Sequence, residues 1–344
     1  MKILLLEYIT AGGFYDVTLP SSLLREGQMM RDALLRDFSQ LDEITIITTH
    51  DARLLKPNNL PPDAIEIFTD PWPVWQELLQ TCEAALVIAP ETGNILHKLT
   101  AMVESSNAQN LGCDTSSIVI TGSKFSTFKT LQAAAIPTVQ TYRAESFFSE
   151  ISSSTYSALN QSQAYVVKPD DGAGSENTRF FKTVAQLKDW LGEHKSELKN
   201  FIIQPFQPGI PASISLLCHH DKAWVLASNR QKIEKEDNDS ESYAFRYTGS
   251  DVNALKSFEP AFSRLAEKII QAIPGLNGYV GIDVIIEGDD IVVVDINPRI
   301  TTSYIGLANS LKYNPANLIT SAAVEQGFEW PHLEANVVEV LVCA

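Results

Sequence analysis

Residues 291–306 read IVVVDINPRITTSYIG and join an apolar run to a group of polar side chains. The first four residues are all β-branched, which is typical of a buried strand. The run then ends in Asp295, Asn297 and Arg299, so a carboxylate, an amide and a guanidinium follow one another at the strand end. Burying such groups is costly unless they have partners. The first hypothesis is therefore a ligand site at this edge of a sheet.

A second apolar segment, YVGIDVIIEG at 279–288, precedes this strand, and the turn EGDD joins the two. A tight turn predicts adjacent strands, which places Asp283 beside Asp295. Asn297 lies two residues beyond Asp295 and projects to the same face. Three oxygen ligands next to phosphates suit Mg²⁺ or Mn²⁺, so these are the candidate metal ligands. Ordinary turn and cap residues are the alternative.

The composition predicts a folded, acidic protein. The chain has 344 residues, a net charge of −16 and about a fifth of its residues charged, enough for two or three lobes with a sizeable core. The negative charge argues against nucleic acid as a partner. The start MKILLLEY is too short for a signal sequence, and no apolar run is long enough for a membrane span, so we expect a cytoplasmic protein. The four scattered cysteines are expected to be reduced thiols: Cys82, Cys113, Cys218 and Cys343.

Apolar β-type runs alternate with helical stretches, which predicts α/β architecture. In the first 110 residues, strands at 3–9, 44–49 and 83–90 and a helix at 21–38 indicate a mainly parallel sheet. The loops TAGGF and PETGN then lie at carboxyl ends of strands, where ligands tend to bind. Later strands follow one another closely and are expected to be antiparallel, giving α+β character to the second part: 164–169, 201–206, 213–220, 223–233, 279–288 and 291–298.

Six elements in order carry a family resemblance. They are Lys124, Lys168, DDGAGSENT (170–178), IIQPFQPG (202–209), GIDVII (281–286) and VVVDINPR (292–299). In this order they resemble the ATP-grasp superfamily over residues 120–310. EYITAGGF, LPSSLLREG and APETGNIL, in the first 96 residues, are also similar to the tyramine–glutamate ligase branch, which serves methanofuran and methylofuran synthesis.

The resemblance implies an ATP-grasp fold preceded by a parallel α/β pre-ATP-grasp domain. We expect that domain over 1–115, a small lobe over 116–205, and a large lobe carrying the metal site over 206–344. The implied activity is an ATP-dependent carboxylate–amine ligase that uses Mg²⁺ or Mn²⁺. By the branch resemblance its substrates are the γ-carboxyl of L-glutamate and tyramine or a tyrosine-like amine.

The nucleotide site follows from the same elements. Lys168 ends a strand beside a glycine loop. A cation at this place suits a nucleotide phosphate, and the glycines let backbone N–H groups approach the phosphate oxygens. A surface lysine before a polar turn is the alternative. In the family this lysine contacts the α-phosphate. A second lysine from the preceding helix also binds phosphate, and here Lys124 is the candidate, with Lys129 as the alternative. The segment 202–209 would form a hinge whose backbone faces adenine. Many family members have Glu where Pro205 stands. Because Pro has no N–H, the N–H of Phe206 is expected to donate to adenine, together with backbone carbonyls as acceptors. The remaining nucleotide-binding candidates are Gly172, Gly174, Ser175 and Gln204.

Candidate catalytic groups are cations. Arg299 offers a fork for the transferred phosphoryl group. In the family a basic residue after the strand 223–227 reaches the γ-phosphate, and here Arg230 or Lys232 is expected before Lys235, with a solvated strand end as the alternative. The candidate substrate-binding residues are Glu7, Arg25 and Glu91, with Glu26 beside them and Arg246, Thr301, Thr302 and Ser303 as the fallback.

The expected reaction needs no covalent nucleophile, because a carboxylate attacks ATP to form an acyl phosphate that an amine then displaces. The segments 170–178 and 234–248 are expected to exclude water as lids. Two alternatives stay open: a dinucleotide-dependent oxidoreductase, although TAGGF lacks the G-x-G-x-x-G spacing, and an ATP sensor without turnover. The sequence does not decide the oligomeric state, and a homodimer is one possibility.

Overall fold

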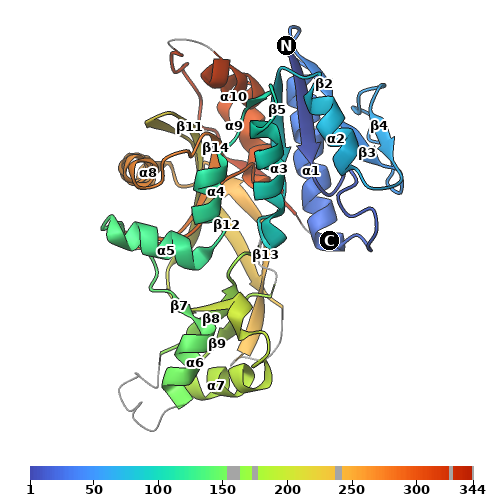
Figure 1. The fold of residues 1–344 in the computed structure, drawn as a ribbon. Coiled ribbons are helices and arrows are strands. Elements are labelled where there is room, and N and C mark those ends of the chain that lie inside the picture. The colour runs from blue at the N-terminus through green and yellow to red at the C-terminus, as the bar shows by residue number, and fades with distance from the viewer. Residues whose placement is uncertain (153–162, 173–176, 237–241, 325–327, 343–344) are drawn as a thin grey trace.

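The computed structural model of the chain describes residues 1–152, 163–172, 177–236, 242–324 and 328–342 (Figure 1). The N-terminal part is a four-stranded parallel sheet in the order β2-β1-β5-β6, as predicted. Strand β1, at the centre of this sheet, is buried on both faces. Continuous apolar strands of this kind are typical of parallel sheets that are covered on both sides. The strands are β1 (Lys2–Glu7), β2 (Thr45–Ile47), β5 (Ala84–Ile88) and β6 (Gln109–Asn110).

Three helices pack on this sheet, and a small ribbon extends from it (Figure 1). The helices are α1 (Ser21–Phe38), α2 (Trp72–Leu79) and α3 (Ile95–Glu104), and the ribbon pairs β3 (Thr49–Asp51) with β4 (Ile65–Ile67). Within the described residues, no helix has both the length and the apolar character that crossing a bilayer requires.

The second part is a ten-stranded sheet whose order is β15-β14-β11-β12-β13-β9-β8-β10-β7, with β16 on β13. The described strands of this sheet pair with one another in antiparallel fashion, which confirms the predicted change of sheet type. Its strands are β7 (Tyr142–Arg143), β8 (Tyr165–Pro169), β9 (Arg179–Phe181), β10 (Phe201–Pro205), β11 (Ile210–His219), β12 (Lys222–Lys235), β13 (Ser242–Val252), β14 (Gly278–Glu287), β15 (Asp290–Asn297) and β16 (Val338–Leu341).

Strand β13 connects two lobes of this sheet. Its first residues pair with β9, and its later residues pair with β12 and β16. The small lobe contains β7 to β10 with α6 (Ala144–Ser152) and α7 (Val184–Glu193). Its hydrophobic core is separate and consists of buried side chains between Ala144 and Ile203. The large lobe is covered by α4 (Thr115–Thr121), α5 (Lys124–Ala133), α8 (Glu259–Ala272), α9 (Leu307–Leu311) and α10 (Pro315–Val324).

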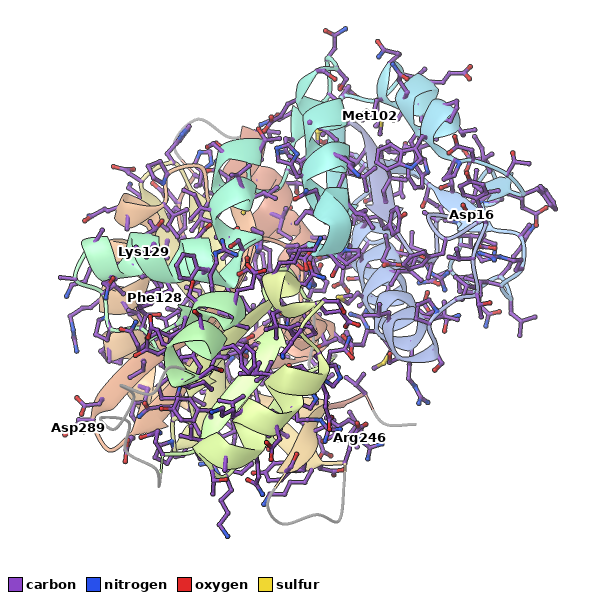
Figure 2. The ribbon with its side chains drawn as sticks, turned by 60° about the horizontal axis from the view of Figure 1, so that its bottom comes forward. Asp16, Met102, Phe128, Lys129, Arg246 and Asp289 are labelled. Carbon is purple, nitrogen blue, oxygen red and sulfur yellow. The ribbon has the colours of Figure 1, made fainter. Side chains whose placement is uncertain are left out.

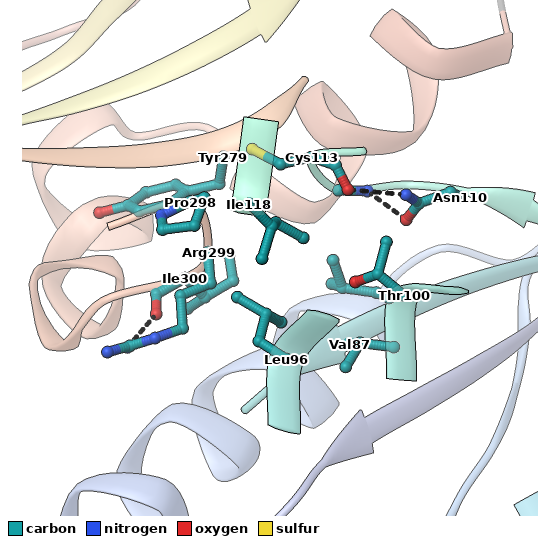
Figure 3. A pocket seen from close by; sticks show the side chains of 12 residues that line it. Val87, Leu96, Thr100, Asn110, Cys113, Ile118, Tyr279, Pro298, Arg299 and Ile300 are labelled. Carbon is teal, nitrogen blue, oxygen red and sulfur yellow. Dashed lines mark hydrogen bonds between the residues drawn. The ribbon is translucent and has the colours of Figure 1, made fainter. Parts of the chain in front are cut away.

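The N-terminal sheet and the large lobe share one hydrophobic core. Leu4 and Leu6 of β1 belong to the same buried cluster as Ile214 of β11 and Ile296 of β15. Figure 3 shows part of this junction, where Val87 and Leu96 face Pro298 and Ile300 around a gap of about 10 Å³. That volume is at the limit for a single water molecule, so the junction is a packed contact and not a ligand pocket.

Candidate active site

A cleft of about 450 Å³ lies between the two lobes of the large sheet. Strands from both lobes line it, and α1, α5 and the short helix η4 (Thr302–Gly306) contribute further side chains. A pocket of this size can hold a small organic ligand. Charged side chains from segments far apart in the sequence meet in this cleft.

The candidate metal ligands are adjacent, as the hairpin predicts. Asp283 of β14 lies opposite Asp295 of β15, and Asn297 Nδ2 donates to Asp283 Oδ2 at 3.2 Å. Burial, followed by the charge of Asp295, raises the pKa of Asp283 to about 6. Among the described residues no three His, Cys, Asp or Glu side chains form a metal-binding group, so Asn297 Oδ1 is needed as a third ligand. Two carboxylates held against their repulsion beside an amide oxygen fit Mg²⁺ or Mn²⁺.

Two lysines project into the cleft next to this pair. Lys124 begins α5, its Nζ lies 3.1 Å from Asp295 Oδ2, and it donates to the Gly172 carbonyl at 2.6 Å. Burial opposes its charge, but Asp295 and Glu91 raise the pKa of Lys124. Lys168, near the end of β8, is buried, which lowers its pKa to about 8. A bound phosphate would favour the charged form of both.

The start of α5 explains why Lys124 and not Lys129 reaches the cleft. Ser123 is the N-cap, and its Oγ accepts from Ser126 N and donates to Asp170 Oδ2. Asp170 also accepts from Phe125 N, so the residue after the Lys168 strand fixes the first turn of the helix. Lys129 lies on the exposed side of α5 (Figure 2).

Arg299 lines the cleft but already has an acidic partner. Its Nε donates to Glu91 Oε1 at 2.9 Å and its Nη2 to Glu91 Oε2 at 3.1 Å. Burial opposes the charge of the guanidinium, but Glu91 raises the pKa of Arg299 above its usual value. Glu91, predicted to bind a substrate ammonium, is therefore the partner of a predicted catalytic residue.

The predicted hinge also lines the cleft, with Gln204, Pro205, Phe206 and Gln207. Gln204 Nε2 donates to Thr141 Oγ1 at 2.9 Å, which fixes its side chain. The N–H of Phe206, which we expected to face adenine, donates to the Ala164 carbonyl at 2.8 Å. Because that bond extends the pairing of β10 with β8, the expected donor is already used within the sheet.

The structure does not place Arg230 and Lys232 in the cleft. Side chains alternate along a strand, and Gln231 is the residue that faces Asp283, with Nε2 2.8 Å from its Oδ1. Lys232 lies on the other face, pairing with Asp251 at 2.8 Å and with Glu339. Arg230 is exposed. The expectation that either reaches the γ-phosphate is thus corrected by strand parity.

Lys235, expected to be the weaker candidate, lines the cleft. Gln231, Ile233 and Lys235 alternate along β12 and all line the cleft, and Glu234 lines it as well, beyond a register shift between Lys232 and Ile233. The Lys235 ammonium lies 4.3 Å from the centre of the Tyr243 ring. The alternation that places Gln231 inward therefore places Lys235 inward as well.

Two predicted substrate residues also lie elsewhere. Glu7 is buried, and its carboxylate accepts hydrogen bonds from Thr10 N at 2.9 Å and Thr10 Oγ1 at 2.7 Å. It therefore stabilises the loop that follows β1. Gly27 of α1 packs directly on this carboxylate. Arg25 is exposed on α1, whereas the neighbouring Glu26 lines the cleft. The sequence could not settle this difference, because it depends on how α1 is rotated about its axis.

Several expectations fall on residues outside the described ranges. Gly174 and Ser175 of the glycine loop belong to these, as do parts of both expected lids. Most of the described remainder of 234–248 is strand, at the end of β12 and the start of β13. Arg246, part of the fallback set, pairs with Glu234 at 2.9 Å on β13 (Figure 2). The other fallback residues, Thr301, Thr302 and Ser303, line the cleft.

The residues missed by sequence reasoning are Gln231, Met30 and Tyr247, which line the cleft. The Tyr247 hydroxyl accepts from Thr302 Oγ1 at 3.0 Å, and burial raises the pKa of Tyr247. Met30 lies four residues after Glu26, on the same face of α1. Helical spacing from Glu26 could have identified Met30, but the other two require knowledge of strand register.

Known families match most of this chain. An ATP-grasp domain model matches residues 121–303, and a pre-ATP-grasp 3 domain model matches residues 44–118. The tyramine–L-glutamate ligase of Methanocaldococcus jannaschii is 32% identical over 318 residues, which are 91% of this chain and 86% of that protein. The enzyme of the same name from Methanocaldococcus fervens is 32% identical over 309 residues, 89% of each chain.

Solved structures share the fold at lower identity. A protein of Archaeoglobus fulgidus assigned to the ATP-grasp superfamily superposes with a TM-score of 0.69 at 22% identity, covering 99% of both chains. D-alanine–D-alanine ligase from Bacillus anthracis gives a TM-score of 0.62 at 15% identity over 94% of this chain and 97% of that one. Together with the cleft and its paired cations and carboxylates, these matches show that the chain belongs to the ATP-grasp family and is an ATP-dependent carboxylate–amine ligase.

Proposed function

We propose that this ligase joins the γ-carboxyl of L-glutamate to tyramine or a tyrosine-like amine, as a step of methylofuran biosynthesis. The observation that carries the proposal is the 32% identity to two tyramine–L-glutamate ligases, which extends through the N-terminal domain as well as the nucleotide-binding lobes. An ATP-grasp ligase for another amino acid and amine is the alternative, because substrate preference depends on few side chains.

Different lining residues of the cleft are proposed to bind the different parts of ATP. In this proposal adenine lies at the hinge formed by Gln204 to Phe206, and the phosphates lie at Lys124 and Lys168. The carbonyl of Gly172, which accepts from Lys124, keeps the glycine loop next to that lysine. Gly174 and Ser175 of the same loop are proposed phosphate contacts by sequence.

Asp283, Asp295 and Asn297 are the residues that would hold Mg²⁺ or Mn²⁺, and the ion would neutralise charge on the terminal phosphates. Gln231 and Asn297 donate to the two oxygens of Asp283 and so fix the plane of that carboxylate. Lys124 fixes Asp295 in the same way. These contacts orient the proposed ligands before a nucleotide binds.

The reaction is proposed to proceed through an acyl phosphate. The γ-carboxylate of glutamate attacks the γ-phosphorus of ATP and releases ADP, and the amine then displaces phosphate to form the amide. Arg299 and the two lysines would stabilise the negative charge of the transferred group. No side chain has to form a covalent bond in this scheme, so the protein's contribution is orientation, charge and exclusion of water.

The acid and the amine are proposed to bind beyond the metal ligands, where Glu26, Met30, Tyr247 and Thr302 line the cleft. The Glu26 carboxylate suits a substrate ammonium. The Met30 side chain offers an adaptable apolar surface of the kind an aromatic amine can contact.

A phosphate-release screen of amino acids crossed with amines, with mass spectrometry of the product, tests this proposal. We expect release that requires MgATP, L-glutamate and tyramine together, and a product with the mass of γ-glutamyltyramine. Release with a different pair would support the alternative ligase. No release with any pair, despite ATP binding, would identify a non-catalytic ATP sensor and overturn the proposal.

Two further parts of the proposal concern the protein in the cell. We propose a cytoplasmic location, which suits ATP as co-substrate, and a homodimer as the assembly to test against a monomer by light scattering. Neither affects the chemistry argued above.

A further inference from the structure

The loop that follows β5 contacts two separate segments of the ATP-grasp lobes. Glu91 in this loop forms the bidentate pair with Arg299, which follows β15. The next two residues hold the glycine loop, since Thr92 Oγ1 donates to the Asp171 carbonyl at 3.0 Å and Gly93 N donates to Asp171 Oδ2 at 3.1 Å. Three consecutive residues of the N-terminal domain thus contact both segments that are proposed to handle phosphate.

The pairing with Glu91 fixes the Arg299 side chain without using all of its donors. A guanidinium has five N–H groups in one plane. Three donate within the protein: Nε and Nη2 to Glu91, and Nη1 to the Ile300 carbonyl at 3.2 Å, a bond also drawn in Figure 3. The plane of the group is set by these bonds, and the other two N–H groups of this side chain, which lines the cleft, have no acceptor among the residues that the structure describes.

Burial makes this contact specific. The side chains of Arg299 and Glu91 are 11% and 7% exposed, so water can scarcely replace either partner. Removing one member of a buried pair leaves the other without its partner, and the remaining side chain then reorients or loses its place. Glu91 itself is not among the residues that line the cleft, so it can act there only through its neighbours.

We propose that Glu91 is a positioning residue for the phosphoryl-transfer step. It holds the Arg299 guanidinium so that its two remaining N–H groups are directed at the transferred phosphoryl group. The N-terminal domain therefore takes part in the chemical step as well as in substrate binding. This inference rests on the proposed role of Arg299 and is independent of which amine the enzyme uses.

A double-mutant cycle of Glu91→Gln and Arg299→Lys tests the inference. Gln keeps the size of Glu, but its amide N–H₂ repels one guanidinium N–H, and Lys cannot form a bidentate pair. ADP release is measured with L-glutamate and tyramine, or with the pair that the phosphate-release screen identifies. Because small misplacements at a reacting centre are costly, we expect Glu91→Gln to reduce kcat about 10- to 100-fold with the KM for ATP changed less than about threefold.

The double variant should be no slower than Arg299→Lys alone. If Glu91 acts only by orienting Arg299, its substitution has no further effect once Arg299 has been replaced. Glu77→Gln, an exposed acid-to-amide change on α2, is the matched control and should retain wild-type kcat. Glu91→Asp, which keeps the charge with a shorter arm, should recover part of the kcat lost in Glu91→Gln, and it serves as the test if Glu91→Gln does not fold.

Three results would overturn the inference. Wild-type kcat in Glu91→Gln would show that the pair does not orient Arg299. Multiplicative losses in the double variant would show that the two residues act separately. A raised KM for the acid or the amine at unchanged kcat would make Glu91 a substrate-binding residue. If Arg299→Lys alone keeps wild-type kcat, the proposed role of Arg299 fails first, and the inference fails with it.

Discussion

At the scale of single residues, two cations of the cleft are paired with carboxylates before any ligand binds. Lys124 lies beside Asp295, and Arg299 beside Glu91. Buried pairs of this kind contribute little net stability, because desolvation offsets most of the attraction, but they fix side-chain positions. The arrangement suits an enzyme that depends on orientation rather than on a covalent nucleophile.

Asp295→Asn should reduce turnover by orders of magnitude while leaving the fold intact. The substitution removes one of two charged oxygen ligands proposed for the metal, and it also removes the partner of Lys124. The measurement is kcat at saturating Mg²⁺, together with a far-UV spectrum. Asp290→Asn, at the exposed start of the same strand, is the control. Near-normal turnover of Asp295→Asn at high Mg²⁺ would contradict the metal assignment.

Lys168→Ala should weaken ATP binding. A charge-assisted bond to phosphate contributes about 1.5–3 kcal/mol, which corresponds to roughly a 10- to 100-fold rise in Kd. Titration calorimetry with a non-hydrolysable ATP analogue and Mg²⁺ measures this change. Lys222→Ala, at the exposed start of β12, should bind like the wild type. Equal Kd values for the two variants would make Lys168 an ordinary strand residue.

At the scale of elements, the hairpin of β14 and β15 was predictable and strand β12 was not. A turn of two residues between apolar runs predicts the hairpin and its pairing as far as Val284 with Val293, but a register shift after that pair is what places Asp295 opposite Asp283. For β12, the sequence contains basic residues at both even and odd positions, and it does not show which of the two sets faces the cleft. Gln231 occupies the inward position, and Lys235, four residues later, shares its parity and lines the cleft too. Register set by distant strands decides such cases.

Gly209→Ala should destabilise the protein more than Gly288→Ala. Gly209, between the hinge and β11, has φ +138°, and an added Cβ would lie 2.5 Å from the Ile286 carbonyl oxygen. Gly288, in the turn after β14, has φ +62° and open space around it. We expect a loss of about 1–3 kcal/mol for Gly209→Ala and about 1 kcal/mol for Gly288→Ala. Urea unfolding measures both; equal losses would contradict the steric argument.

At the scale of the whole molecule, the order of elements predicted the fold but not how its parts meet. The change from parallel to antiparallel strands was visible in segment spacing, and the ATP-grasp elements appeared in sequence order. The shared core of the N-terminal sheet and the large lobe was not visible, since apolar residues do not specify their partners. Glu7 shows the consequence: α1 packs over it, so a carboxylate at a strand end became an internal hydrogen-bond acceptor.

The packing of α1 against the lobes leads to a prediction about substrate choice. Glu26 lines the cleft while its neighbour Arg25 is exposed, so two adjacent residues of one helix provide a test and its control. If the N-terminal domain contributes an ammonium-binding carboxylate, Glu26→Gln should raise the KM for glutamate or for the amine, because the amide lacks the charge that pairs with an ammonium.

Loss of that charge-assisted contact corresponds to about 1.5–3 kcal/mol, or roughly a 10- to 100-fold rise in KM for the affected substrate. The Kd for MgATP should stay within about twofold, since Glu26 comes from α1 whereas the adenine hinge comes from β10. Arg25→Ala should leave both constants unchanged. Steady-state kinetics with each substrate varied in turn separates these outcomes. Weakened ATP binding in Glu26→Gln, or an equal rise in KM in Arg25→Ala, would place the recognition of the substrate ammonium on other side chains of the cleft, such as Thr302, which donates to the Tyr247 hydroxyl.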